Sequence, residues 1–202
     1  MPNETDLQST THLDVKHRIM DAAGQLFADK GFAATSISDI TEAAGVGRAL
    51  IYYYFKDKRH LYNAILHDGG ERIIGGAEAA YASGGTAFDR LRQFIVRFRQ
   101  LHIDRPNLAR IAMRAELEGS LSFDASPKEH FDKVASILER IVEEGMEQGE
   151  LRRVDPIKAI HMVMGMIHSL VMMQIQGVSD PCPDRDIDFA MSVLTGGIAA
   201  QK

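Results

Sequence analysis

The stretch that most constrains the fold of this chain runs from Thr35 to Phe55. Ser36, followed by Asp39 three residues later, has the spacing of a capping box, which predicts that a helix begins there. Gly45 predicts where that helix ends, because glycine adopts the left-handed conformation of a helix end without a Cβ clash. A second short helix follows. Two short helices joined by a tight glycine turn form a helix-turn-helix, whose second helix can enter the major groove of DNA.

Apolar residues in this stretch predict which sides of the two helices face inward. They recur at helical spacing, which puts them on one face of each helix. The inward positions are Ile37, Ile40 and Ala44 in the first helix, and Leu50 or Ile51 with Tyr54 or Phe55 in the second.

A wider set of residues extends this motif through the first third of the chain, namely Arg18 to Ala23, Leu26-Phe27, Gly31-Phe32, Thr35, Gly45-Val46, Tyr52 to Phe55, Lys58 and Leu61. In these residues the chain resembles the tetracycline-repressor (TetR) family of bacterial transcription regulators. The chain departs from the family pattern at Thr41, where the family usually has alanine, at Gly47, where it usually has serine, and at Leu50, where it often has threonine. The resemblance implies that the loss of the serine removes a helix cap and one phosphate contact.

This resemblance implies that the chain binds double-stranded DNA at a palindromic operator. Arg48 lies in the first turn of the recognition helix, and arginine is the usual bidentate partner of guanine. Leu50 cannot hydrogen-bond a base but can touch a thymine methyl group. For Tyr52 and Tyr54, packing in the core is an equal alternative to a DNA contact. The candidate DNA-binding residues are Thr35, Ser36, Ser38, Arg48, Leu50, Tyr52, Tyr53, Tyr54 and Lys58.

Length and charge fit a regulator with a basic head. The 202 residues suffice for one large domain or two small ones, and the net charge of −5 does not suit a nonspecific DNA coater. Between Val15 and His60, seven basic minus five acidic residues leave +2, so the acidity lies elsewhere. The polar stretch from Met1 to Asp14 has no apolar segment typical of a signal peptide, and a single cysteine fits a reducing compartment. We therefore expect a cytoplasmic protein.

The periodicity predicts an all-α protein in which an N-terminal three-helix helix-turn-helix domain precedes a C-terminal bundle of about six helices. Residues 1–12 are expected to be a flexible tail, 13–58 the DNA-binding domain and 59–202 the ligand-binding and dimerisation domain. We interpret the pairs Gly69-Gly70 and Gly75-Gly76 as a soft linker, because glycine weakens a helix by about 1 kcal/mol relative to alanine. Beyond the fourth helix, the expected helices span about 86–104, 107–118, 126–149, 156–176 and 184–199.

For the C-terminal domain, the resemblance implies a pocket for a small-molecule effector between the fifth and eighth helices. The residues suit a mostly apolar or aromatic ligand with one or two hydrogen-bonding groups. Plain core packing is the alternative for every one of them. The candidate ligand-binding residues are Phe94, Phe98, His102, Met113, Leu138, Met164 and His168.

The segment from Ile157 to Ile175 is apolar on almost every side, which indicates a helix covered all round. Lys158 and His161 within it argue against a membrane span. A second copy of the chain would supply the missing cover, so the sequence predicts a homodimer through the eighth and ninth helices. In a monomer, the methionines would instead fill gaps in the core. The stripe predicted to match on the ninth helix is Ile187, Ala190, Met191, Leu194 and Ile198, with Gly197 allowing close approach.

No metal, cofactor or catalytic site is predicted. His161 and His168 have no fixed carboxylate or histidine partners in the sequence, although a sensing role for them or for Cys182 stays open. Phe189 stands where a calcium loop beginning at Asp184 needs its glycine, so that reading fails. The remaining alternatives are a DNA-binding regulator without an effector, and an α-helical enzyme or lipid-binding protein. The chain lacks the phosphate loop, nucleophile elbow and metal-binding helix motif of common enzymes.

Overall fold

The computed structural model describes residues 4–117, 126–178 and 183–198, and all the regular elements in these ranges are helices. This confirms the predicted all-α class. The boundaries predicted for the fifth to ninth helices agree with the structure to within about two residues, the scatter expected at helix ends. The helices are α1 (Glu4–Lys30), α2 (Ile37–Ala44), α3 (Arg48–Tyr54), α4 (Lys58–Ala82), α5 (Ala87–Asp104), α6 (Pro106–Leu117), α7 (Ser126–Glu147), α8 (Pro156–Ile175) and α9 (Pro183–Ile198).

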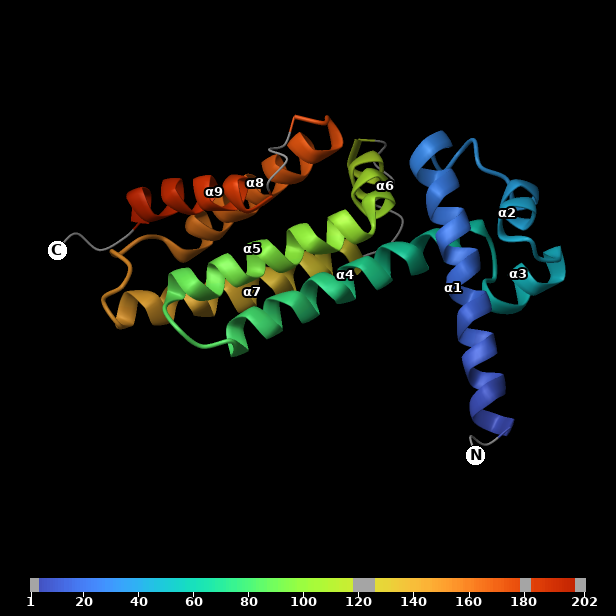
Figure 1. Cartoon of the computed structure of the whole chain (residues 1–202), viewed down its shortest axis with the longest axis horizontal. Helices are drawn as coiled ribbons and strands as arrows, with labels where there is room; N and C mark the ends of the chain where they lie inside the picture. Colours follow the sequence, from blue (N-terminus) through green and yellow to red (C-terminus); the bar gives the residue numbers. More distant parts are fainter. Residues whose placement is uncertain (1–3, 118–125, 179–182, 199–202) are drawn as a thin grey trace. The chain divides into compact units, whose positions relative to one another are not determined.

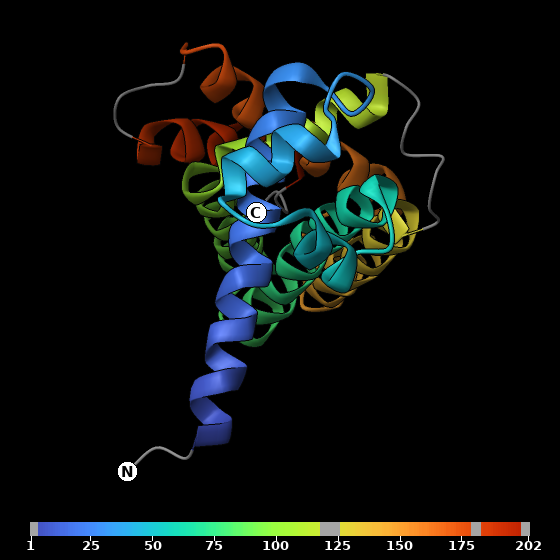
Figure 2. The same ribbon diagram turned by 90° about the vertical axis from the view of Figure 1, so that its right-hand side faces the viewer.

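Helix α1 begins nine residues earlier than predicted. Residues 4–12, for which a flexible tail is predicted, continue α1 without a break in the structure. The physical reason is that this polar stretch contains neither glycine nor proline after Pro2, so nothing in it prevents a helix from extending. The first turns of α1 project away from α2 and α3 in both views of the chain (Figures 1 and 2).

The chain divides into two compact units, 1–69 with 107–124 and 70–106 with 125–202. The division differs from the predicted boundary at residues 58/59, because the first half of α4 and almost all of α6 belong with α1, α2 and α3. The core of the first unit holds an aromatic group in which the Tyr62 ring lies 5.1 Å from Phe27 and 5.0 Å from Phe32. Ile19, Ile40, Ile51, Phe55 and Ile111 complete this core.

In the second unit, α5 is the central helix and packs against α7, α8 and α9 (Figure 1). Thr86 begins α5 with a capping box, since its hydroxyl accepts from the Asp89 N–H while the Asp89 carboxylate accepts from the Thr86 N–H. The core of the unit collects apolar residues from all of its helices, among them Leu91, Phe94, Leu138, Ile141, Val163, Ile167, Ile187 and Leu194.

The two glycine pairs of α4 differ in their packing. The helix is continuous from Lys58 to Ala82, and the boundary between the two compact units falls between Gly69 and Gly70, so the interpretation of this pair as a soft linker stays a prediction. Both residues are buried, and a Cβ at either position would overlap a neighbouring side chain, Leu108 for Gly69 and His130 for Gly70. A Cβ at Gly75 would meet open space. The first glycine pair therefore allows close contacts that any larger residue would prevent.

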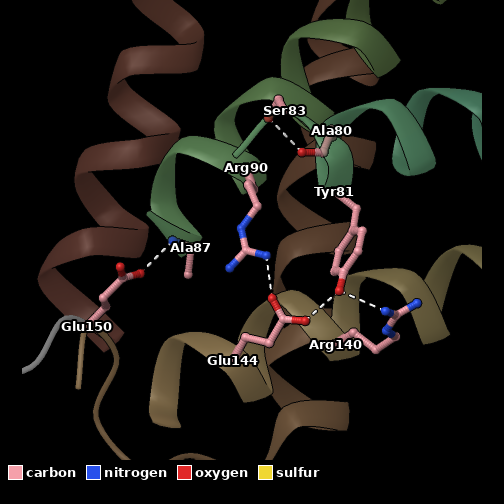
Figure 3. A network of polar contacts seen from close by, with 8 residues as sticks. All are labelled: Ala80, Tyr81, Ser83, Ala87, Arg90, Arg140, Glu144 and Glu150. Carbon is pink, nitrogen blue, oxygen red and sulfur yellow. Dashed lines mark hydrogen bonds and ion pairs between the residues drawn. The ribbon is translucent and has the colours of Figure 1, made fainter. Parts of the chain in front are cut away.

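Arginines of α5 join that helix to its neighbours. Arg90 donates to the Glu144 carboxylate of α7 at 2.6 Å, and the Tyr81 hydroxyl donates to the other oxygen of Glu144 at 2.5 Å (Figure 3). Arg140 donates to the Tyr81 oxygen at 2.7 Å, so the network also includes α4. On the opposite side, Arg99 and Asp186 form a buried ion pair with α9 at 3.2 Å. Arg92 pairs with Asp188 at 2.9 Å.

Helices α8 and α9 each bury one apolar face and expose another. Four members of the predicted stripe of α9 pack into the chain's own second unit, namely Ile187, Ala190 and Leu194, which are at most 6% exposed, and the partly buried Met191, whereas the environments of Gly197 and Ile198 fall outside the described residues. The prediction that this stripe faces a partner subunit is therefore wrong. A different set of apolar residues faces outward, namely Ile157 and Met162 of α8 with Phe189 and Val193 of α9, each at least half exposed.

Candidate functional site

The first helix of the predicted motif begins as its sequence requires. The Ser36 hydroxyl accepts from the Asp39 N–H at 3.1 Å, and the Asp39 carboxylate accepts from the Ser36 N–H at 2.9 Å. The hydrogen bonds from Ser36, first from its backbone N–H, hold the pKa of Asp39 below its ordinary value. This reciprocal box fixes the direction in which α2 leaves the preceding loop.

The turn between the helices depends on two glycines with different roles. Gly45 ends α2 in the left-handed conformation, with φ of 62°, which is the role predicted for it. Gly47 is the N-cap of α3 in an extended conformation, and no side chain caps that helix. Ile51 and Phe55, rather than Leu50 and Tyr54, are the fully buried residues, which decides the alternatives that the sequence left open. Arg48, in the first turn of α3, is exposed.

The outward face of α3 presents an arginine held by a tyrosine one turn later. Arg48 donates to the Tyr52 hydroxyl at 3.3 Å, and its guanidinium carbon lies 5.6 Å from the centre of the Tyr52 ring. Both side chains are exposed, Tyr52 to 45%. The pair restricts the arginine to positions near the start of the helix, which is the part of a recognition helix that reaches base edges.

The other candidates around α3 differ in exposure. Tyr53 is 71% exposed, and its ring packs edge to face on Tyr54, 5.0 Å away. Tyr54 and Leu50 are half-buried. Ser38 is exposed in the first turn of α2, where its carbonyl accepts from the Thr41 hydroxyl at 2.7 Å.

Two candidate DNA-binding residues have structural roles within the first unit. Thr35 is 1% exposed, and its hydroxyl donates to the Gly31 carbonyl at 2.8 Å, so its side chain is not on the surface. The Lys58 ammonium donates to the carbonyls of Phe32 and Thr35 at 2.7 Å each. It also lies 4.4 Å from the centre of the Phe32 ring. These contacts hold the loop between α1 and α2 against the start of α4, so both residues position the motif.

Lys56 is a cation that the sequence analysis did not single out. It lies in the turn between α3 and α4, and its side chain is exposed. In the sequence, Lys56 and Lys58 look equivalent, because they are two residues apart in the same turn. Only the tertiary contacts of Lys58 show that Lys56 is the more accessible of the two.

Helix α6 is attached to α1 through side chains. Asn107 donates to Gln25 at 2.7 Å, and Arg110 pairs with Asp29 at 2.9 Å. Ile111 is 1% exposed within the core of the first unit. Because α6 follows α5 directly in the chain, these contacts join the end of α5, through α6, to α1, the helix that precedes the helix-turn-helix.

Three of the predicted ligand-binding residues form a row on α5. The Phe98 ring lies 5.9 Å from Phe94 and 4.4 Å from His102. His102 is 6% exposed, and its Nδ1 lies 2.7 Å from the Phe98 carbonyl. Burial lowers the pKa of His102, against the opposing effect of this hydrogen bond.

The remaining ligand-binding candidates are less uniform. Leu138 is fully buried in the core that includes Phe94, and Met164 packs against the same core. His168 is exposed, so it lies outside that core. The side chain of Met113 and the whole of Cys182 fall outside the described residues.

Comparisons with known proteins agree with these features. Residues 19–65 match the family model described as bacterial regulatory proteins of the tetR family, and residues 84–172 match the tetracyclin repressor-like C-terminal domain. The fatty acid metabolism regulator protein of Bacillus subtilis is 27% identical over 155 residues, which cover 76% of this chain and 80% of that protein. The transcriptional repressor KstR of Mycolicibacterium smegmatis is 27% identical over 148 residues, covering 73% and 71% of the two chains.

Among solved structures, FadR of Bacillus subtilis in complex with stearoyl-CoA superimposes with a TM-score of 0.77. It is 26% identical, and the match covers 90% of this chain and 98% of that one. A TetR family regulator from Marinobacter aquaeolei, 24% identical, has the same fold with a TM-score of 0.75 over 96% of this chain and 99% of that one.

The fold and the exposed face of α3 define a helix-turn-helix protein that binds DNA. The chain belongs to the TetR family of bacterial transcription regulators and is a regulator, not an enzyme. Among the described residues, α8 alone is long and apolar enough to cross a membrane by length and composition. It is a core helix of a soluble regulator, since Ile160, Val163 and Ile167 lie in the core of the second unit.

Proposed function

We propose that this cytoplasmic regulator is a repressor that binds a palindromic operator as a homodimer and is released by a small, mostly apolar effector. The exposed arginine at the start of α3 is the observation that carries the DNA-binding part. Its guanidinium donates to the Tyr52 hydroxyl at 3.3 Å, and both side chains are exposed. An arginine held in this way can donate two hydrogen bonds to the O6 and N7 atoms of one guanine.

Phosphate contacts would surround this base contact. Ser36, Ser38, Tyr53 and Lys56 are exposed around the motif and offer hydroxyl or ammonium donors. Leu50 is half-buried and reaches a thymine methyl only with its outer atoms. Thr35 and Lys58 act through the loop that they hold, because their polar atoms already bind main-chain carbonyls.

The chemistry of the α5 row and the relatives support the proposed effector. Phe94, Phe98 and His102 combine two aromatic rings with one polar group, which suits a ligand that is apolar over most of its length. A related regulator has been solved with stearoyl-CoA, whose acyl chain is a ligand of this kind. We therefore propose an effector with a long apolar part and a polar group that reaches His102.

Effector binding can release DNA only if the effector binds the two forms of the regulator with different affinities. The row on α5 ends four residues before Pro106, where α6 begins, and α6 is tied to α1 through Gln25 and Asp29. A shift at the end of α5 would therefore be transmitted to α1 by α6 as well as by α4. That movement would change the separation of the two recognition helices in a dimer.

The experiment that tests DNA reading starts from duplexes selected from a random pool by the full-length protein. We expect a palindromic site whose half-sites lie about one helical turn apart, roughly 34–36 Å, or somewhat further. Arg48→Ala should weaken binding to this site by about 1–3 kcal/mol and relax the preference at one base pair, measured by mobility-shift titration. Ala49→Ser, an exposed position beside it, is the control and should keep the preference. Wild-type affinity and preference in Arg48→Ala would remove the base-reading role.

A regulator that binds DNA without any effector is the second candidate. It would bind the selected site equally well in the presence of every apolar ligand tested. Mass spectrometry of the purified protein, followed by release assays with any ligand that is carried over, separates the two candidates.

A further inference from the structure

His102 is a buried polar residue with only part of its hydrogen-bonding capacity used. It is 6% exposed, and among the described residues it makes a single hydrogen bond, between its Nδ1 and the Phe98 carbonyl at 2.7 Å. The Phe98 ring also contacts the imidazole in a tilted arrangement, with 4.4 Å between the two ring centres. The orientation of the ring is therefore set by two contacts with the same residue.

The hydrogen bond also fixes which nitrogen carries the proton. A carbonyl oxygen can only accept, so at 2.7 Å the Nδ1 atom must be the donor. In a neutral imidazole, the other nitrogen then has a lone pair and no hydrogen. Burial lowers the pKa of His102, which favours this neutral form. Nε2 is therefore an acceptor.

This acceptor is not sealed inside the protein. In the described part of the chain, the side-chain atoms that are fully buried and have no hydrogen-bond partner do not include Nε2, so this atom keeps some exposed surface. Within the described residues no group is bonded to Nε2, so a partner from outside the chain can reach it although the residue as a whole is buried. A ligand that places a donor there replaces the hydrogen bond of any water it displaces, whereas a ligand without a donor loses that bond.

We infer that the effector meets His102 with a hydrogen-bond donor, a hydroxyl or an amide N–H, and not with a carbonyl, ether or ionised carboxylate. This inference rests on the proposed effector site and specifies the chemistry of its polar end. The apolar remainder of the ligand would lie along Phe98, whose half-buried ring is next to His102 in the row on α5.

The test compares ligands that share one dodecyl chain and differ only at the end. 1-Dodecanol and dodecanamide carry donors, whereas dodecyl methyl ether and dodecanoate do not. Binding to the full-length protein is measured directly by calorimetry, without DNA. One hydrogen bond predicts that the two donors bind about 10-fold more tightly than the ether. Binding without DNA release would contradict the proposed repressor mechanism but leave this inference intact.

Two variants assign the preference to His102. His102→Leu should abolish the difference between dodecanol and the ether, while His102→Gln, which can place a carbonyl oxygen near the position of Nε2, should keep part of it. In protein with 15N-labelled histidine, the Nε2 resonance that disappears in His102→Gln should be that of an unprotonated nitrogen. It should shift with dodecanol and not with the ether. Tighter binding of dodecanoate with formation of an imidazolium, or equal binding of alcohol and ether, would overturn the inference.

Discussion

At the residue scale, Gly47 shows how one departure from the family pattern affects both stability and DNA binding. It is the N-cap of α3, its backbone is extended with φ of −72° and ψ of 148°, and a Cβ there meets open space. Gly47→Ser should therefore fit without strain and cap α3. We expect a gain of a few tenths to about 1 kcal/mol in the free energy of unfolding, because the hydroxyl binds a free N–H of the first turn. Urea unfolding measures it.

The same substitution should tighten binding to the selected duplex, since a serine hydroxyl at the start of α3 can donate to a DNA phosphate. Gly45→Ser is the matched control. Gly45 has a φ of 62°, so a side chain there costs about 1 kcal/mol or more and should lower both stability and DNA affinity. If Gly47→Ser instead destabilises the protein, the uncapped start of α3 has another cause.

The residues around the motif show what the sequence could and could not predict. Ser36 with Asp39, and Gly45, follow rules that act within a few residues, and the structure confirms both roles. The partners of Lys58 and Thr35, in contrast, follow no such local rule. Lys58 reaches the carbonyl of Phe32, 26 residues earlier in the chain, and no local pattern encodes such a contact. Contacts between residues close in the sequence were therefore predictable, whereas hydrogen bonds with residues far away in the chain were not.

At the element scale, the glycines of α4 have two explanations, a softer helix or close packing, and substitutions distinguish them. If Gly70 only softened the helix, alanine would stabilise it by about 0.5–1 kcal/mol. Because a Cβ at Gly70 overlaps the ring of His130, we expect Gly70→Ala to destabilise the protein by about 1–3 kcal/mol. Gly75→Ala, on the same helix with nothing within 4 Å, is the control and should be stabilising. Thermal unfolding of both variants gives the two signs, and stabilisation by both would favour the linker interpretation.

The polar network between α4, α5 and α7 predicts a dependence of stability on pH. The hydrogen bond from Arg90, followed by that from Tyr81, lowers the pKa of Glu144 from its ordinary 4.5. The folded state then binds fewer protons than the unfolded state near this pH, so the stabilisation is fully present above pH 4.5 and is lost as the pH falls through the lowered pKa.

Glu144→Gln should therefore lose stability against wild type at pH 7, and the difference between the two should shrink at about pH 4 and below. Urea unfolding at a series of pH values measures this. Glu143→Gln, an exposed neighbour, should show no such convergence. A difference that stays constant across the whole series would mean that the Glu144 charge does not stabilise the fold.

The arginines of α5 show that the burial of a charged residue can also depend on partners that are distant in the sequence. Leu91, Phe94 and Ile95 are apolar residues at helical spacing, and all three are buried. Arg90 and Arg99 are 5% and 4% exposed, although their residue type favours the surface. Their burial depends on Glu144 and Asp186, which are supplied by helices far away in the chain.

At the scale of the whole molecule, the proposed dimer depends on apolar residues that the protomer leaves uncovered. Met162 of α8 and Phe189 of α9 are each 70% exposed, and neither belongs to the core of its own chain. Met166 packs against that core, so a charge there would test folding and not association. The better change is the double variant Met162→Glu with Phe189→Glu. Uncompensated charges at the interface should weaken association by about 3 kcal/mol or more, roughly 100-fold.

Light scattering and sedimentation at micromolar concentration should then show a dimer for the wild-type protein and a folded monomer for the double variant. Its affinity for the full palindrome should fall toward that for a half-site, because the two recognition helices are no longer linked. Ile103→Glu places a charge at an exposed apolar position of α5, outside the proposed interface, and should stay dimeric. A double variant that remains a dimer would place the interface elsewhere, and a monomeric wild-type protein would contradict a dimer altogether.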